Sequence, residues 1–123
     1  MTIGLFSLSL NVKDIAASKA FYELLGFKAV FGEETQGWLI LDNGATKIGL
    51  FQGMIKKNTL TFNPGWGPDA APLTDFEDVR AIQKRLKAAD VPIISPADET
   101  TTGPANCIIS DPDGNPVLLD QHV

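Results

Sequence analysis

The fold is decided by the stretch DPDGNPVLLD at residues 111–120. Its first five residues are turn formers, because proline fixes φ while glycine and asparagine tolerate positive φ. Residues 106–110 and 116–120 on either side are rich in β-branched and aliphatic side chains, which predicts a β-hairpin that closes the domain. A weaker copy of the same pattern occurs earlier, where LDNG at residues 41–44 is followed by KIGLF at residues 47–51.

Composition predicts one globular domain over residues 1–123, since 44% of the residues are hydrophobic and 20% are charged. The net charge of −5, with no basic cluster beyond Lys56 and Lys57, argues against a nucleic-acid partner. Cys107 is the only cysteine, so no intrachain disulfide can form, which fits a reducing compartment. Residues 1–10 lack the features of a signal peptide, and no apolar run reaches the roughly 20 residues of a membrane-spanning helix. We therefore expect a cytoplasmic protein without a membrane partner.

Hydrophobic periodicity predicts a β-α-β-β-β order in the first half. Residues 5–12 alternate apolar and polar side chains, as a strand with one buried face does. Asp14 is the expected N-cap of a helix that runs to about residue 25, and Gly26 follows where a left-handed residue ends many helices. The apolar face of this helix is predicted to contain Ala17, Phe21, Leu24 and Leu25. The three remaining strands are predicted at residues 27–31, 37–41 and 47–51.

The second half repeats this order. After a linker at about residues 54–58, a strand is predicted at 59–63, followed by a loop that contains Trp66. Thr74 and Glu77 have the capping-box spacing, which predicts that the second helix starts there. The last strands are predicted at residues 91–95, 106–110 and 116–120. Positions in the first half recur 64 or 69 residues later, which predicts two modules at about 1–53 and 59–123, although chance similarity between two such units is the alternative.

Two segments resemble the vicinal oxygen chelate superfamily, which includes glyoxalase I, extradiol dioxygenases and bleomycin-resistance proteins. LNVKDIAASKAFYELLGF at residues 10–27 is similar to the opening motif of the family, and DPDGN at residues 111–115 is similar to its closing hairpin. With the repeated β-α-β-β-β order, the resemblance covers nearly the whole chain. It implies an α+β fold in which two tandem βαβββ modules form a cupped, incomplete mixed-sheet barrel with the helices outside. It says little about activity, because that scaffold carries many unrelated functions.

The resemblance also implies a metal site in the metal-dependent members, with ligands from the first and fourth strands of each module. Three of those positions correspond here to Ser7, Gly49 and Leu118. The fourth falls within residues 58–63, which contain no histidine, aspartate or glutamate. A divalent cation needs several such ligands, so we expect no metal and no other cofactor. Asp120 and His122 share one strand face and could meet in the cup, but two donors leave a metal under-coordinated. A solvent-exposed terminal histidine is the stronger interpretation.

Strand alternation predicts the residues that line the cup. Small polar and apolar side chains on three strands are expected to face it, and three aromatic residues are candidates for its walls or rim; the predicted ligand-binding residues are Ser7, Ser9, Asn11, Trp38, Gly49, Phe51, Phe62, Trp66, Cys107, Leu118 and Asp120. For Phe51, Phe62 and Leu118 taken singly, ordinary core packing is the better interpretation. Trp66 either stacks on a ligand or pins its own loop. Cys107 has no neighbouring base or cation that would activate it, so no catalytic residue is assigned.

These observations leave three functional hypotheses. The first is a metal-free protein of the bleomycin-resistance type, a homodimer that sequesters a small organic molecule. The second is an enzyme, a glyoxalase-like lyase or an extradiol-dioxygenase-like protein, with an atypical metal site that includes Asp120 or His122. The third is a scaffold or regulatory domain with a vestigial cup. The dimer is implied by the resemblance; the sequence itself requires only that exposed strand edges be covered.

Overall fold

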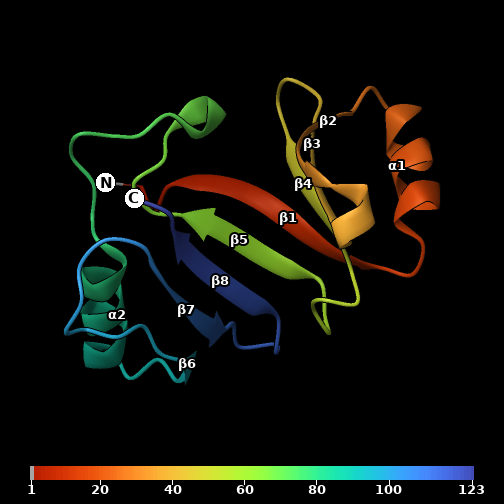
Figure 1. The fold of residues 1–123 in the computed structure, drawn as a ribbon. Helices are drawn as coiled ribbons and strands as arrows, with labels where there is room; N and C mark the ends of the chain where they lie inside the picture. Colours follow the sequence, from red (N-terminus) through yellow and green to blue (C-terminus); the bar gives the residue numbers. More distant parts are fainter. Residues whose placement is uncertain (1) are drawn as a thin grey trace. The chain divides into compact units, whose positions relative to one another are not determined.

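The computed structural model describes residues 2–123 and has the α+β composition that the sequence predicts. Its elements follow one another as β1 (Leu5–Val12), α1 (Ile15–Glu23), β2 (Lys28–Glu33), a 3-10 turn (Glu34–Gln36), β3 (Trp38–Asp42), β4 (Lys47–Gln52), β5 (Thr59–Asn63), a second 3-10 turn (Pro68–Ala70), α2 (Val79–Ala88), β6 (Ile93–Ser95), β7 (Ala105–Ser110) and β8 (Pro116–Gln121). The repeated β-α-β-β-β order is confirmed (Figure 1).

The described residues form two compact units. The N-terminal unit is Ser7–Thr59, and the C-terminal unit comprises residues 2–6 and 60–123. In the N-terminal unit the strands lie in the order β2-β3-β4-β1, and in the C-terminal unit in the order β5-β8-β7-β6. Strand directions also match between the two units. In each unit the first and last strands, β1 with β4 and β5 with β8, pair in parallel, and the other pairs named here are antiparallel. Two copies of one module therefore make up the chain.

Each unit has its own core between its helix and one face of its sheet. The N-terminal core contains Ile15, Phe27, Leu39, Leu41, Ile48 and Leu50, with Leu10, Val12 and Tyr22 packed against it. The C-terminal core contains Val79, Ile82, Ala97, Cys107 and Leu119. Leu10 and Val12 thus face α1, as the alternation of β1 predicts, and the polar side chains between them lie on the other face of the sheet.

The predicted apolar face of α1 is wrong at its C-terminal end. The helix ends at Glu23 with Leu24 as its C-cap, so Leu24 and Leu25 leave the helical spacing that would have aligned them with Phe21. These three side chains are 85%, 60% and 57% exposed for Leu24, Leu25 and Phe21. The side chains that α1 directs into the core are instead Ile15 and Tyr22.

The predicted capping box of the second helix is also wrong. Residues 74–77 are not helical, and α2 begins at Val79 after the N-cap Asp78. Asp78 Oδ1 accepts a hydrogen bond from the Arg80 backbone N–H at 2.8 Å, so the residue that caps this helix is Asp78 and not Thr74. The new start still places Val79 and Ile82 on the buried face.

The closing turn is stabilised by its first residue. Asp111 Oδ1 accepts hydrogen bonds from the backbone N–H groups of Asp113 and Asn115 at 2.9 and 2.8 Å, and Asp111 Oδ2 accepts one from Asn115 Nδ2. The side-chain hydrogen bond from Asn115, with the backbone donors of the turn, lowers the pKa of the Asp111 carboxyl. Gly114 adopts φ 88°, a conformation that favours glycine. The turn-forming residues therefore act as the sequence indicates.

A glutamine at the end of the last strand of each module holds the start of that module's helix. Gln52 Oε1 accepts a hydrogen bond from the Ile15 backbone N–H at 2.8 Å, and Gln121 Oε1 accepts one from the Val79 backbone N–H at 2.7 Å. Gln121 is only 2% exposed, and its Nε2 group also lies 2.9 Å from Asp78 Oδ2. The two glutamines satisfy helix donors that have no partner within the helix.

We expect Gln121→Ala to lower the free energy of unfolding by about 2 kcal/mol, because it leaves the buried Val79 N–H without an acceptor. Gln52→Ala is the matched control, since Gln52 accepts the equivalent bond but is itself exposed, whereas Gln121 is 2% exposed, and it should cost about 1 kcal/mol or less. Urea unfolding of both variants measures the difference. Equal losses would contradict the role assigned to burial.

The stability of the protein should also depend on the charge of Asp78. Burial alone would raise its pKa, but hydrogen bonds from the Gln121 amide, the Arg80 backbone N–H and the Arg80 guanidinium outweigh burial and lower it. A carboxyl with a lowered pKa contributes stability above its unfolded-state value of about 3.9 and loses that contribution as the pH falls through the folded-state value. Asp78→Asn keeps the capping oxygen and removes the charge. The difference in unfolding free energy between wild type and Asp78→Asn should be constant from neutral to mildly acidic pH and shrink below about pH 4; a pH-independent difference would contradict this.

Candidate ligand-binding face

The sheet face opposite α1 brings together six of the predicted ligand-binding residues. Because Leu10 and Leu50 face the helix, their neighbours along each strand point to the opposite side. This surface, called the ligand face below, carries the side-chain positions of Ser7, Ser9, Asn11, Trp38, Ile40, Gly49 and Phe51. Strand alternation alone was sufficient to predict that six of these residues, all except Ile40, lie on the same face.

Register divides the ligand face into two rows across neighbouring strands. Asn11 pairs with Phe51, and Phe51 pairs with Trp38, so one amide residue and two aromatic residues occupy paired positions on this face. In the second row, Ser9 pairs with Gly49 and Gly49 with Ile40. Directly paired residues have side chains about 5 Å apart, which is within contact distance for aromatic rings.

Gly49 makes room for the ring of Phe51. A Cβ atom at position 49 would lie 2.6 Å from Phe51 Cε2 and 3.3 Å from Ile40 Cδ1. The φ angle of Gly49 is not in the left-handed region, so the requirement for glycine is one of space. At Gly49, where the family resemblance implies a metal-ligating glutamate, the space of a side chain is occupied by the Phe51 ring.

Polar groups border the aromatic row. Ser7 and Ser9 are 8% and 6% exposed. The Asn11 backbone N–H donates to Asn58 Oδ1 at 2.9 Å, and Asn11 Nδ2 donates to the Lys56 carbonyl at 3.4 Å. Residues 56–58 are therefore tied to the end of β1. Aromatic surface with a few hydroxyl and amide groups is the composition of a site for a small organic molecule.

Four predicted site residues lie in the strands of the C-terminal unit. Leu118 pairs with Thr61 and Ile108, and together with Asp120 it lies on the sheet face opposite α2. Asn63 Nδ2 donates to the Asp120 carbonyl at 2.8 Å. The structure places Phe62 and Cys107 on the other face, packed in the α2 core. Burial raises the pKa of the Cys107 thiol, so this side chain is inert packing.

Trp66 stacks on a histidine near the end of the chain. Its ring stacks on that of His122, with the centroids 4.5 Å apart and the planes 8° apart. Its backbone carbonyl accepts a hydrogen bond from the Leu5 N–H at 3.0 Å. His122 Nε2 lies 3.1 Å from Asp120 Oδ2, so the two residues do meet as their shared strand face allows. One face of the indole is occupied by the imidazole.

The described residues do not fit the divalent metal that the family resemblance implies. Within residues 2–123, no group of three or more histidine, cysteine, aspartate or glutamate side chains lies close enough to hold an ion. The carboxylate of Asp120 is already bonded to His122, and this pair supplies only two donors.

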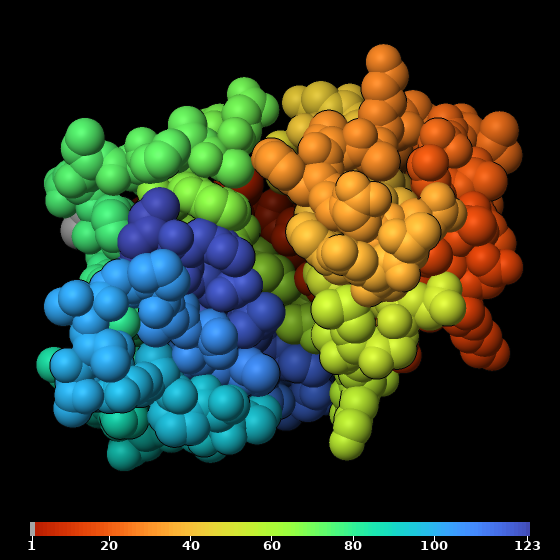
Figure 2. Space-filling model, viewed as in Figure 1, coloured from red at the N-terminus to blue at the C-terminus, as the bar shows by residue number. Residues whose placement is uncertain are grey.

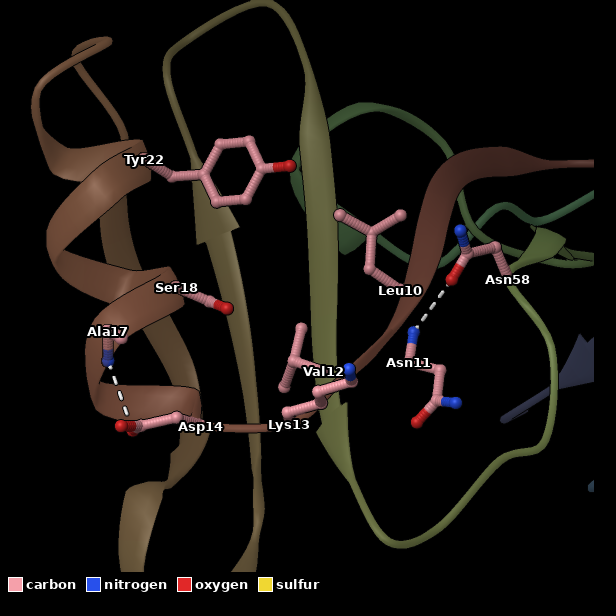
Figure 3. A pocket seen from close by; sticks show the side chains of 9 residues that line it. All are labelled: Leu10, Asn11, Val12, Lys13, Asp14, Ala17, Ser18, Tyr22 and Asn58. Carbon is pink, nitrogen blue, oxygen red and sulfur yellow. Dashed lines mark hydrogen bonds between the residues drawn. The ribbon is translucent and has the colours of Figure 1, made fainter.

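The structure also contains an open groove that the sequence analysis did not predict. It has a volume of about 500 Å³ and lies between α1 and the end of β1, on the helix side of the sheet; its lining residues are Leu10, Asn11, Val12, Lys13, Asp14, Ala17, Ser18, Tyr22 and Asn58 (Figure 3). Asp14 caps α1 by accepting from the Ala17 N–H at 3.2 Å. Asp14, Ser18 and Tyr22 recur at four-residue spacing on one helix face, and that polar stripe was the available sequence signal.

Comparison with protein-family models gives a match over residues 4–119, and the matching family is the Glyoxalase/Bleomycin resistance protein/Dioxygenase superfamily. The chain belongs to this superfamily. No protein with a curated description matches the sequence.

Two solved structures share the fold of this superfamily member. A protein from Legionella pneumophila, described as an NAD-dependent benzaldehyde dehydrogenase, has a TM-score of 0.71 at 17% identity and covers 97% of this chain and 100% of its own. A glyoxalase/bleomycin resistance protein/dioxygenase superfamily member from Vibrio splendidus 12B01 has a TM-score of 0.66 at 15% identity, with 95% and 97% covered. At these identities the similarity shows the fold alone. No helix within residues 2–123 is long and apolar enough to span a membrane.

The close approach of Phe51 to Gly49 can be tested by a double-mutant cycle. Gly49→Ala should lower the free energy of unfolding by about 1–3 kcal/mol, because the added methyl group overlaps the Phe51 ring. In a Phe51→Ala background the same substitution should cost much less, because the overlapping atoms are gone. Urea unfolding of the four proteins measures the coupling. An equal cost in both backgrounds would show that the ring does not lie over position 49.

Proposed function

We propose that this protein binds a small organic molecule without a metal, on the ligand face, and sequesters it. The observation that supports this most directly is that Asn11, Phe51 and Trp38 occupy paired positions on three neighbouring strands and belong to one sheet face. Membership of a superfamily that includes bleomycin-resistance proteins agrees with a binding function. The lack of a metal-ligand set among residues 2–123 favours binding over Lewis-acid catalysis.

The composition of the ligand face indicates the chemistry of the ligand. Phe51 and Trp38 offer flat apolar surface, which favours a planar or aromatic group. Asn11 lies beside them, and its amide can exchange hydrogen bonds with a carbonyl, hydroxyl or amide substituent. By the same alternation Lys47 and Asp42 lie on this face, but they form an ion pair at 2.9 Å, so their charges offset each other and a strongly anionic ligand is disfavoured. The expected ligand is a neutral planar molecule with polar substituents.

Two alternative functions would require different features of the protein. A glyoxalase-like lyase or dioxygenase with an atypical site would require Asp120 and His122 to bind a metal with further donors, for which their contact at 3.1 Å is the only structural support. A scaffold with a vestigial site would bind no ligand at all. Assembly as a homodimer and location in the cytoplasm, without a nucleic-acid or membrane partner, belong to the same proposal and are supported by the acidic composition and the family resemblance.

A thermal-shift screen of neutral planar compounds, followed by calorimetric titration, tests the proposal. A ligand present at 100 times its dissociation constant stabilises the folded state by about 2.7 kcal/mol, which gives a clear rise in Tm. Phe51→Ala and Trp38→Ala should each raise Kd about tenfold, corresponding to the loss of roughly 1.4 kcal/mol of stacking and burial. Ser18→Ala and Tyr22→Phe are the matched controls, since they alter only the groove beside α1.

The outcomes separate the three hypotheses. Weakened binding in the Phe51 and Trp38 variants alone supports the ligand face. Weakened binding in the groove variants alone moves the site to the other side of the sheet. Stoichiometric metal in untagged protein, lost together in Asp120→Asn and His122→Ala, would replace the proposal by the metal-dependent enzyme. If the protein is folded but binds no compound of this class, only the hypothesis of a scaffold with a vestigial site remains.

A further inference from the structure

The groove beside α1 is separate from the ligand face. It lies on the helix side of the sheet, and all its lining residues belong to the N-terminal unit. Its volume of about 500 Å³ falls in the range of roughly 300–1,000 Å³ that is usual for small-molecule sites. A molecule in the groove would therefore lie on the opposite side of the sheet from the ligand face.

The inner surface of the groove is apolar. Leu10, Val12 and Tyr22 line it and also pack against the N-terminal core, so the groove reaches the surface of that core. These three residues are half-buried, which leaves apolar surface that a ligand can cover. Figure 3 shows Ser18 and Tyr22 pointing from α1 toward the sheet, and neither hydroxyl forms a hydrogen bond to another of residues 2–123. The groove therefore combines an apolar wall with two hydroxyl groups.

Lysines lie in and next to the groove, although the protein has a net charge of −5. Lys13 is a lining residue, and Lys56 and Lys57 directly precede the lining residue Asn58. The Lys56 carbonyl accepts the hydrogen bond from Asn11, which holds this segment at the end of β1, and Figure 2 shows the yellow-green segment between β4 and β5 projecting from the surface. All three lysines are exposed, and none forms an ion pair within residues 2–123. Unpaired cations beside an apolar groove favour a ligand with a negative charge.

One carboxylate limits the charge that the ligand can carry. Asp14 is the only acidic residue among the lining residues, and its Oδ1 accepts the Ala17 N–H as the N-cap of α1. Figure 3 shows Asp14 and Lys13 at the same end of the groove, where the chain passes from β1 to α1. Because like charges repel, a ligand with two or more negative charges would be opposed more strongly than one with a single charge. The groove therefore favours a monoanion.

We propose that this groove is a second binding site, which takes an organic monocarboxylate with an apolar body. The carboxylate lies at Lys13, and the apolar body covers Leu10, Val12 and the ring of Tyr22. The hydroxyl groups of Ser18 and Tyr22 can donate hydrogen bonds to oxygen atoms of the ligand. The site differs from the ligand face in its position and in the charge of its ligand. The proposal does not depend on the function proposed above.

Amide NMR spectra of the full chain, recorded during a titration with octanoate, test the site. Wild type should show saturable shifts for residues of α1 and of the end of β1. Octan-1-ol has the same apolar chain without the charge and should bind about fivefold more weakly, the effect of one exposed ion pair. Lys13→Gln should raise the Kd for octanoate by a similar factor of about five. Lys84→Gln, at an exposed position on α2, changes the net charge equally and should leave Kd within about twofold of wild type.

Two further variants test the groove without altering a lysine. Ala17→Leu fills the groove with a good helix former and should abolish octanoate binding, while circular dichroism shows that the protein is folded. Asp14→Asn keeps the capping oxygen, removes the opposing charge and should lower Kd about twofold.

Several results would overturn the proposal. Wild type might show no saturable shifts at tens of millimolar octanoate, octan-1-ol might bind as tightly, or Lys13→Gln and Lys84→Gln might have equal effects. Binding that survives Ala17→Leu, or that Asp14→Asn weakens, would overturn it as well. Shifts confined to β3 and β4 would place octanoate on the ligand face instead, and that result leaves the separate test with neutral planar compounds unchanged.

Discussion

The contact on which each module depends joins the first residue of its helix to the end of its last strand. Gln52 accepts the Ile15 N–H and Gln121 accepts the Val79 N–H, at 2.8 and 2.7 Å. The first and last strands of a module are parallel neighbours, so their ends lie at the same edge of the sheet, where the helix begins. The glutamine therefore fixes the helix over one sheet face, and the alternate side chains of the same strands lie on the opposite face.

The repeat was visible in the sequence, but this contact was not. Gln52 and Gln121 are 69 positions apart, as Ile48 and Val117 are, and the helix starts are 64 apart, so the spacing of both partners was already present. A glutamine at the end of a strand is ordinary, and only the folded arrangement shows which donor it meets. The start of α2 was misplaced for the same reason, since the capping box at residue 74 satisfies a local rule while Asp78 also gains hydrogen bonds from Gln121 and Arg80. Local patterns predicted the strands and turns; contacts between distant residues decided the helix ends.

The site was predictable to the extent that it follows strand alternation. Side chains of β1 and β4 point alternately to the two faces of the sheet without interruption. The prediction could therefore assign Ser9, Asn11, Gly49 and Phe51 to the same face. Phe62 and Cys107 could not be placed in this way, because their faces depend on which residues of β8 they oppose. Both are aligned with Leu119, which packs against α2. The groove beside α1 depends on the path of residues 56–58 back to β1, which no periodicity encodes.

The two modules have the same order but differ in what they leave exposed. In the C-terminal unit, the buried side chains of Arg80 and Gln83 hold the loop that precedes β7 through hydrogen bonds to Asp98, Gly103 and Ala97. The N-terminal unit instead exposes the end of α1 and the edge strand β2. Phe31 of this edge pairs with Ile40, which lies in the same row of the ligand face as Gly49 and Ser9. The row of Ser9, Gly49 and Ile40 therefore continues to the edge of this unit's sheet at β2.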